Sequence, residues 1–518
     1  MTPDADNPTN RNVEPPATVW LPDLLYADGR FQSDMALVSD ASGRILSVAE
    51  LPEELFEALG SSPDSIALPE LGLIVAARFV RLRGRALLPG LVNAHSHAFQ
   101  RLIRGRTEYR SAASRDSFWT WRELMYSAAL RLSPADIYDA SRMAFLEMLT
   151  AGITAVGEFH YLQHTPEGAP YDDPNLLARE VVRAARDTGL RIALLRVAYA
   201  RSGYGKPPDA RQARFVEPEV ETYLRRVEEL KRDLEGRETG DGARYAWVGV
   251  APHSVRAVPL RYLRAVCAFA EAERLPVHMH VAEQRAEIEA CVEEYGQTPV
   301  ALLDREGFLN ERFTAVHAVH ITPEEAQALA RARSIVCACP TTERNLGDGI
   351  VPADLLFQSG ARIALGTDSH TQIDLLEDAR ELEYHLRLQK QERNVLAPQA
   401  DEKDAEEASA GAKIKTSALA ARLFECATAA GAESIGAESG ELASGRPADF
   451  FTVALDDSSI AGASTEDLLS VILFSLARTA VREVAVGGRL VVEDGRHAAS
   501  VEIVERFAAL QRRLWDEG

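Results

Sequence analysis

The chain contains little cysteine. Only five cysteines occur in 518 residues, and an odd number with irregular spacing does not indicate a disulfide framework. Cys337 and Cys339 lie in an apolar run that is typical of a strand, which favours buried free thiols over ligands or redox partners. We therefore leave all five cysteines out of the expected site.

Long apolar runs and an excess of positive charge are also missing. No apolar run approaches the ~20 residues that cross a bilayer, and the polar start at residues 1–7 does not resemble a secretion signal. The 57 basic and 78 acidic residues give a formal net charge of −21, which repels nucleic-acid phosphate and anionic membranes. We expect a cytoplasmic protein without those partners, although local arginines still permit a small anionic substrate.

The central part of the sequence alternates short apolar runs with long amphipathic stretches, which is the pattern of repeated βα units. We therefore predict a (β/α)8 TIM barrel over residues 89–444. Its eight expected strands are 86–93, 155–159, 192–198, 246–251, 277–281, 314–318, 335–339 and 363–367.

Both chain ends have a different texture, with short apolar runs separated by turns. Residues 448–453 and 481–492 read as strands, the latter around the Gly487-Gly488 turn. We expect residues 1–88 and 445–518 to form one small β-sandwich domain, with a terminal helix in the second segment. The N-terminal extension before about residue 17 and the charged segment 399–415, which we interpret as a solvated loop, are assigned no chemistry.

The first barrel run ends in His95-Ser96-His97. Side chains at i and i+2 of a strand point to the same side, so both imidazoles can bind one metal ion. By itself the pair is also compatible with chance histidines on the surface or in the core. The residues at the ends of the other strands test the metal hypothesis, because barrel enzymes carry their active groups at the carboxyl ends of the strands.

Metal-binding residue types recur at those strand ends. His280 closes the fifth run, and Asp368 follows the eighth. We predict that His95, His97, His280 and Asp368 bind one divalent ion, most simply Zn²⁺, with Fe²⁺ or manganese also compatible. We expect His278 to be a packed histidine. The fourth run is followed by His253 and contains no lysine to bridge a second metal.

Three residues near this site suit proton transfer. A bound Zn²⁺ makes hydroxide available near neutral pH, and Asp368 can accept a proton from that water. Glu283 is placed to carry the proton to a departing nitrogen, and His317, after the sixth run, can orient the nucleophile. The alternatives are a solvated carboxylate at a helix start for Glu283 and a buried core histidine for His317.

Three motifs carry a family resemblance: residues 89–97 (PGLVNAHSH), 280–283 (HVAE) and 366–369 (GTDS). They resemble the deaminase branch of the amidohydrolase superfamily, and the resemblance covers nearly the whole chain. Residues 97–101, 116–126 and 158–161 further resemble the branch that deiminates N-formimidoyl-L-glutamate in bacterial histidine degradation. This implies hydrolysis to N-formyl-L-glutamate and ammonia, in a homodimer.

The same resemblance implies a set of substrate-binding residues. Two arginines suit the two carboxylates of a glutamate moiety, because guanidinium groups bind carboxylates in a bidentate manner. The expected substrate-binding residues are Gln100, Arg122, Tyr161, His253 and Arg256. Tyr161 could instead be a packed aromatic residue and Arg122 a structural ion-pair partner.

A pair of tryptophans and a loop lie near these residues in the sequence. We expect Trp119 and Trp121 to pack their own loop rather than contact substrate. The loop at 203–215, rich in glycine and proline at its start, is expected to cover the pocket.

Two rival functions stay open at this point. A deaminase of guanine or another heterocycle would use the same metal site but would not need two arginines for carboxylates. A catalytically inactive metal-binding barrel would not need Glu283 and His317 beside the ligands.

Overall fold

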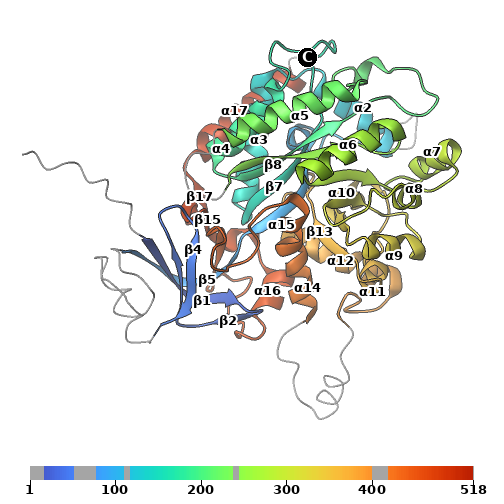
Figure 1. The fold of residues 1–518 in the computed structure, drawn as a ribbon. Coiled ribbons are helices and arrows are strands. Elements are labelled where there is room, and N and C mark those ends of the chain that lie inside the picture. Colours follow the sequence, from blue (N-terminus) through green and yellow to red (C-terminus); the bar gives the residue numbers. More distant parts are fainter. Residues whose placement is uncertain (1–16, 52–76, 110–116, 237–243, 399–417, 517–518) are drawn as a thin grey trace, which may run out of the picture.

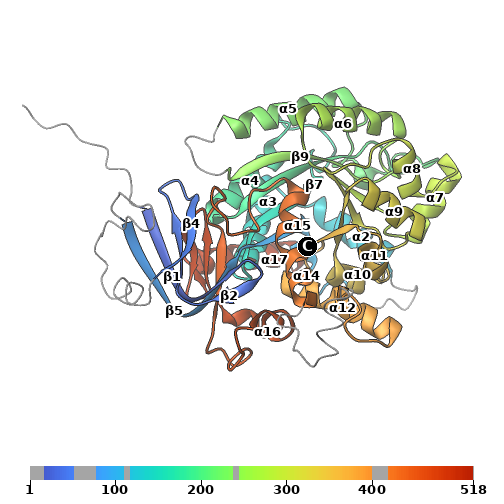
Figure 2. The same ribbon diagram turned by 60° about the horizontal axis from the view of Figure 1, so that its bottom comes forward.

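The computed structural model describes residues 17–51, 77–109, 117–236, 244–398 and 418–516. The N-terminal extension and the segment 399–415 lie outside these described residues. Figures 1 and 2 show a barrel and, beside it, a sheet to which both ends of the chain contribute strands. No helix in the described ranges is long and apolar enough to cross a membrane.

Eight parallel strands follow one another around the barrel in chain order from β6 to β13. All eight are almost wholly buried, which is why they read as continuous apolar runs rather than as alternating ones. They are β6 (Leu91–Ser96), β7 (Ile153–His160), β8 (Arg191–Ala198), β9 (Ala246–Pro252), β10 (Val277–Val281), β11 (Phe313–His317), β12 (Ile335–Ala338) and β13 (Arg362–Leu365).

The barrel closes where its first and last strands meet. Ser96 and Asp368 form a parallel bridge, and the Asp368 amide donates to the His95 carbonyl at 3.0 Å. Gly366 permits this approach, because a Cβ there would lie 2.7 Å from the His95 Cβ. The predicted βα barrel is therefore confirmed.

The helices pack outside the strands, and some of them start at a clear capping signal. Ser133, for example, caps α3 in a reciprocal capping box with Asp136. The barrel helices are α2 (Phe118–Ala129), α3 (Pro134–Leu149), α4 (Leu176–Thr188), α5 (Val220–Glu235), α6 (Leu260–Glu273), α7 (Arg285–Tyr295), α8 (Pro299–Arg305), α9 (Pro323–Arg331), α10 (Pro340–Leu346), α11 (Ala353–Gln358), α12 (Leu375–Lys390), α14 (Ala418–Ala427) and α15 (Ala429–Ile435), with the 3-10 helices η2 (Ala98–Ile103) and η3 (Ala210–Gln212).

One expected strand is wrong in its extent. The run 86–93 contains the end of β5 (Ala77–Pro89), which pairs in the small sheet, and the start of β6 in the barrel. The chain changes sheets at Gly90, whose amide donates to the Asp449 carbonyl at 3.0 Å. Hydrophobicity does not reveal this break, because the residues on both sides of Gly90 are buried.

The small domain is built on one nine-stranded mixed sheet in the order β17-β16-β15-β14-β5-β1-β3-β4, with β2 paired to β1. Gly487 and Gly488 both have positive φ, which fits the tight two-residue turn that joins β15 to β16. The strands are β1 (Ala17–Ala27), β2 (Arg30–Gln32), β3 (Met35–Ser39), β4 (Ile45–Glu50), β5, β14 (Phe450–Ala454), β15 (Val481–Val486), β16 (Arg489–Glu493) and β17 (Arg496–His497).

Buried and polar contacts join this sheet to the barrel. Arg191 of β8 forms a buried ion pair with Asp449, at 2.7 Å from its Nε. The C-terminal helix α17 (Ser500–Trp515) lies along α3, where Glu502 pairs with Arg142 at 2.6 Å. A further helix, α16 (Leu468–Ser475), lies near α14.

Candidate active site

Four predicted ligands converge at the carboxyl ends of the barrel strands. His95 and His97 lie at the end of β6, His280 in β10 and Asp368 after β13. Asp368 Oδ1 lies 3.3 Å from His95 Nε2 and 3.2 Å from His97 Nε2, and His280 Nε2 lies 3.2 Å from His95 Nε2. One donor atom from each residue lies within 4.8 Å of all the others, and all four residues are buried.

The histidines present the correct nitrogens. His97 Nδ1 lies 2.9 Å from the Phe159 carbonyl oxygen, and His280 Nδ1 lies 3.1 Å from that of His253. A carbonyl oxygen only accepts, so each Nδ1 carries the hydrogen and each Nε2 lone pair faces the centre.

The charge states of the ligands also suit a cation. Burial lowers the pKa of His95 to about 3 and that of His280 well below its usual value, so these imidazoles are neutral at pH 7. Burial acts to raise the pKa of Asp368, but its contacts with His95 and His97 outweigh this effect and hold it well below the usual range. Imidazole nitrogens together with one carboxylate fit a divalent ion such as Zn²⁺.

The backbone at these strand ends is strained. Ala282, His317 and Asp368 all have positive φ, at 54°, 74° and 45°, a region that residues other than glycine rarely adopt. Hydrogen bonds keep the backbone in this conformation. The Ala318 amide, for example, donates to the Val281 carbonyl at 3.0 Å. Strain of this kind concentrates where side chains must be aimed at a site.

Glu283 and His317 lie beside the four ligands. His317 Nε2 is 4.0 Å from Glu283 Oε1 and 3.9 Å from Asp368 Oδ2. Burial, together with the charge of Asp368, raises the pKa of Glu283, although His317 partly offsets the rise. Burial acts to lower the pKa of His317, but nearby Glu283 and Glu343 outweigh it and raise that pKa well above its usual value. Glu283 is only 7% exposed, so it is not a solvated carboxylate.

Sequence reasoning missed two buried carboxylates that support this arrangement. Glu343 of α10 accepts from His317 Nδ1 at 3.2 Å and from the Cys339 amide at 2.9 Å. Glu158 of β7 accepts from Ser96 Oγ at 2.5 Å and from the Ala98 amide at 2.8 Å. Glu158 lies near the end of β7, inside the segment 158–161 that carries the resemblance, although no role was expected for it. Glu343 lies within α10, where neither a motif nor a strand end marks it.

His278 and the thiols of Cys337 and Cys339 take mostly structural positions. His278 Nε2 lies 2.8 Å from the Ser434 carbonyl oxygen, outside the ligand cluster. Cys337 and Cys339 are free and buried, as expected. Cys339 nevertheless lies closer to the site than the sequence indicated, since its Sγ is within 4.8 Å of donor atoms of His317 and Asp368.

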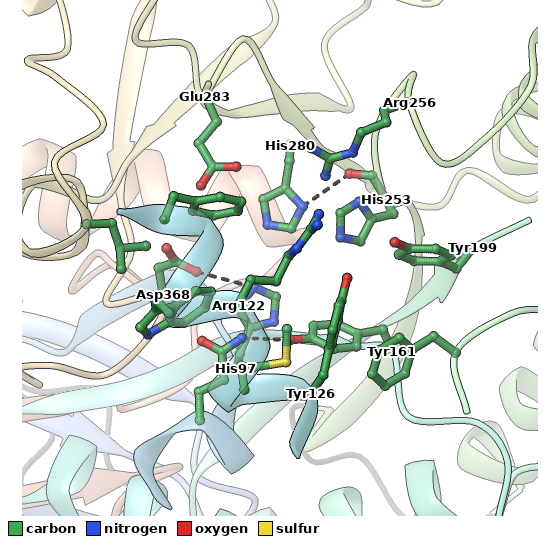
Figure 3. A pocket seen from close by; sticks show the side chains of 16 residues that line it. His97, Arg122, Tyr126, Tyr161, Tyr199, His253, Arg256, His280, Glu283 and Asp368 are labelled. Atoms are coloured by element: carbon green, nitrogen blue, oxygen red, sulfur yellow. Dashed lines mark hydrogen bonds and ion pairs between the residues drawn. The ribbon is translucent and has the colours of Figure 1, made fainter. Parts of the chain in front are cut away.

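A cavity opens beside the ligands. Figure 3 shows Glu283 and Asp368 on one side of it and Arg256, His253 and Tyr199 on the other. All five expected substrate-binding residues line it. The full lining is His97, Gln100, Phe118, Trp121, Arg122, Met125, Tyr126, Tyr161, Tyr199, Phe215, His253, Arg256, His280, Glu283, Leu346 and Asp368.

The tryptophans do not lie in a loop as expected, because residues 118–129 form the regular helix α2. Trp121 lines the cavity, and the expectation that it does not contact substrate stays a prediction. The Trp119 ring packs under Arg122, with the guanidinium carbon 4.5 Å from the ring centre. From the loop at 203–215, Phe215 contributes to the cavity wall.

The two arginines of the cavity have no acidic partner within ion-pair distance among the described residues, whereas many other arginines of the chain do. Arg122 stacks on Trp119 and Tyr126, and its buried Nε has no hydrogen-bond partner there. Burial acts to lower the pKa of Arg256, but the charge of Glu287 outweighs it and raises the pKa. Burial and the Arg256 charge lower the pKa of His253 well below its usual value, so it is neutral.

Gln100 and Tyr161 form a hydrogen-bonded pair in the same wall. Gln100 Nε2 donates to the Tyr161 hydroxyl at 2.6 Å, and this hydroxyl lies 3.5 Å from Met125 Sδ. Gln100 Oε1 is buried without a partner among the described residues. The cavity thus contains one vacant acceptor near the ligands in addition to its two cationic donors.

A parallel barrel with these groups at its strand ends defines a class, the metal-dependent barrel hydrolases. The chain belongs to the amidohydrolase family, whose model matches residues 86–491. It is 38% identical over 434 residues to formimidoylglutamate deiminase of Pseudomonas aeruginosa, covering 84% of this chain and 90% of that protein.

Two further similarities bear on the class. The chain is 30% identical over 418 residues to 8-oxoguanine deaminase of Pseudomonas aeruginosa, covering 79% of this chain and 82% of that protein. The crystal structure of an amidohydrolase from Brucella melitensis has a TM-score of 0.80 and 31% identity, covering 96% of this chain and 99% of the other. The chain is therefore an amidohydrolase-type deaminase, and the family resemblance read from its motifs is confirmed.

Proposed function

We propose that the protein hydrolyses N-formimidoyl-L-glutamate to N-formyl-L-glutamate and ammonia. The observation that carries this proposal is the pair of cavity arginines, Arg122 and Arg256, neither of which has an acidic partner within ion-pair distance among the described residues. A dicarboxylate would supply the missing anions, because guanidinium groups bind carboxylates by paired hydrogen bonds. The relative that is 38% identical and named for this reaction supports the same substrate.

His95, His97, His280 and Asp368 would hold one divalent ion, for which we propose Zn²⁺. Such an ion, when bound, lowers the pKa of a water molecule toward neutrality. Asp368 Oδ2 and His317 Nε2 lie 3.9 Å apart, so one water molecule beside them would contact both. Asp368 would accept its proton and His317 would orient it. Gln100 Oε1 faces no other partner among the described residues and would accept a hydrogen bond from a formimidoyl N–H.

The proton balance then depends on Glu283. The water oxygen adds to the formimidoyl carbon, and the resulting tetrahedral intermediate loses its terminal nitrogen as ammonia. This nitrogen gains two protons before it leaves, and both come from the water. Glu283 can carry them in turn, because burial raises the pKa of its carboxyl. The formyl oxygen of the product comes from water, and the glutamate moiety does not change.

A heterocycle deaminase is the second candidate. Phe118, Trp121 and Phe215 line the cavity and could stack on a planar base, and the 30% identical relative is named for 8-oxoguanine. This candidate leaves Arg122 and Arg256 without a role, which is why we prefer the dicarboxylate. The sequence resemblance also supports a cytoplasmic homodimer in bacterial histidine degradation, and these points stay predictions.

Substitution of the two arginines tests the proposal. We expect Arg122→Ala and Arg256→Ala each to raise KM for N-formimidoyl-L-glutamate about 100-fold or more, since each leaves a desolvated carboxylate without its partner. Arg264→Ala is the matched control, because Arg264 lies on α6 with a largely exposed side chain paired to Glu306. Wild-type kinetics in both cavity variants would contradict the proposed substrate.

A further inference from the structure

Three polar residues outside the expected set lie together at the cavity wall. Tyr126 belongs to α2, Tyr199 follows β8 and Gln212 ends η3. Gln212 Nε2 donates to the Tyr126 hydroxyl at 2.7 Å and to the Tyr199 hydroxyl at 3.0 Å. All three residues are buried, and both tyrosines line the cavity.

This geometry leaves a hydrogen-bond donor available. One amide supplies both of its hydrogens to the two phenol oxygens, so each phenol acts there as an acceptor and keeps its own hydrogen. At most one of the two hydroxyl hydrogens can be shared between the rings, so at least one has no acceptor among the described residues.

The surroundings of Tyr199 favour an anion. Its ring packs against His253, with 4.7 Å between ring centres. Burial raises the pKa of Tyr199, and the charges of Arg256 and Arg122 act in the opposite direction, so both guanidinium groups are electrostatic neighbours of this hydroxyl. The phenol is protonated at neutral pH and remains a donor.

The third tyrosine of the cavity differs from this pair. The Tyr161 hydroxyl accepts a hydrogen bond from Gln100, as the other two accept from Gln212. Its own hydrogen, however, has Met125 Sδ as an acceptor. The spare donor of Tyr126 and Tyr199 is therefore not a general property of tyrosines in this wall.

We propose that Tyr199, supported by Tyr126 and positioned by Gln212, donates to a substrate carboxylate that the cationic side chains also hold. The inference rests on the proposed function and deepens it by naming what distinguishes a carboxylate from a carboxamide at this end of the cavity. A phenol O–H and a guanidinium are both donors, so an anion satisfies them, whereas the NH₂ of a carboxamide meets another donor.

Kinetics of Tyr199→Phe test this assignment. The variant removes one hydroxyl and keeps the ring packed on His253. We expect KM for N-formimidoyl-L-glutamate to rise about 10- to 100-fold with kcat nearly unchanged, as for the loss of one hydrogen bond to a charged group. Tyr204→Phe is the matched control, because Tyr204 precedes the same 3-10 helix and is exposed.

Substrate analogues locate the contact. The α-carboxamide and the γ-carboxamide of N-formimidoyl-L-glutamate each lack one carboxylate. We expect Tyr199→Phe to leave KM unchanged for one of them, which identifies the carboxylate that the hydroxyl binds. Gln212→Leu should raise KM for the parent substrate in the same direction, again without a loss of kcat.

The outcomes separate this inference from the proposed function. If wild-type enzyme releases ammonia from N-formimidoyl-L-glutamate but Tyr199→Phe has the same KM, the inference is overturned and the proposed function stands. An equal rise of KM for both carboxamides and the parent also overturns it, because packing would then explain the effect. If wild-type enzyme releases no ammonia, the proposed function fails. The carboxylate subsite is then tested by glutarate binding: weaker binding to Tyr199→Phe than to wild type would support it. Equal glutarate binding by the two proteins would overturn the subsite as well.

Discussion

At the scale of single residues, burial decides what each ionisable group of the site can do. The same apolar surroundings that keep His95 neutral raise the pKa of Glu283, so one residue is ready to bind a cation and the other to hold a proton. Asp368 stays ionised because two imidazoles contact its carboxylate. The acid and base roles thus follow from different local partners in one buried cluster.

Glu283→Gln tests the proton-transfer role. We expect kcat to fall by about 10²- to 10⁴-fold, with the bound metal content unchanged, because Glu283 is not among the four converging ligands. Ammonia release and metal analysis of the same preparation give the two readings. Glu289→Gln, an exposed position on α7, should retain wild-type activity; a Glu283→Gln enzyme with wild-type kcat would rule out the assigned role.

Glu287 gives a prediction about pH and stability. Burial raises its pKa from 4.5 to about 7, so between these values the folded protein keeps a proton that the unfolded chain releases. Stability contributed by this group is therefore present below pH 4.5 and is lost as the pH rises to about 7.

Glu287→Gln removes this titration. Relative to wild type, the variant should gain about 2–3 kcal/mol in the free energy of unfolding between pH 5 and pH 8. Denaturant unfolding at both pH values measures this difference, with Glu289→Gln as the exposed control. Parallel stability curves for wild type and Glu287→Gln would contradict the assigned shift.

Sequence reasoning found the residues that belong to short motifs and missed those that act through neighbours. The spacing His95-Ser96-His97 fixes two ligands locally, and strand-end position identifies His280, His317 and Asp368. Glu343, Tyr199 and Gln212 have no such signal. Their proximity arises from the way α10, β8 and η3 meet in three dimensions, which no local pattern specifies.

At the scale of elements, the carboxyl ends of the strands concentrate the chemistry. The ligands come from β6, β10 and the segment after β13, so the closure of the barrel brings together His95 and Asp368, which lie at its first and last strands. Most expected strands agree with the structure within two residues. The first run failed because the last residues of β5 and the first residues of β6 are all apolar and buried, which hid the break at the turn signal Pro89-Gly90.

Gly366→Ala tests the close contact that seals the barrel. The added methyl would lie 2.7 Å from the His95 Cβ, so β6 and β13 must separate, at a cost of about 1–3 kcal/mol. We expect a lower melting temperature and weaker metal retention during dialysis against a chelator. Gly236→Ala, at the end of α5 with ordinary helical φ, is the control; equal behaviour of the two variants would show that the closure tolerates the methyl.

At the scale of the whole molecule, a strongly acidic protein contains a cavity with two arginines on its wall. The formal net charge is −21, yet Arg122 and Arg256 line a pocket in which they lack acidic partners within ion-pair distance among the described residues. Buried pairs such as Arg191 with Asp449 hold the β domain to the barrel, so those arginines are already neutralised. The cavity is thus a place where an anionic small molecule can bind despite the overall charge.

The most direct test of the account is ammonia release from N-formimidoyl-L-glutamate, measured beside guanine and 8-oxoguanine with Zn²⁺-loaded and metal-stripped protein. We predict release from N-formimidoyl-L-glutamate alone, its loss on removal of the metal and its recovery when Zn²⁺ is restored. Metal-dependent release from a purine, with none from N-formimidoyl-L-glutamate, would contradict the account.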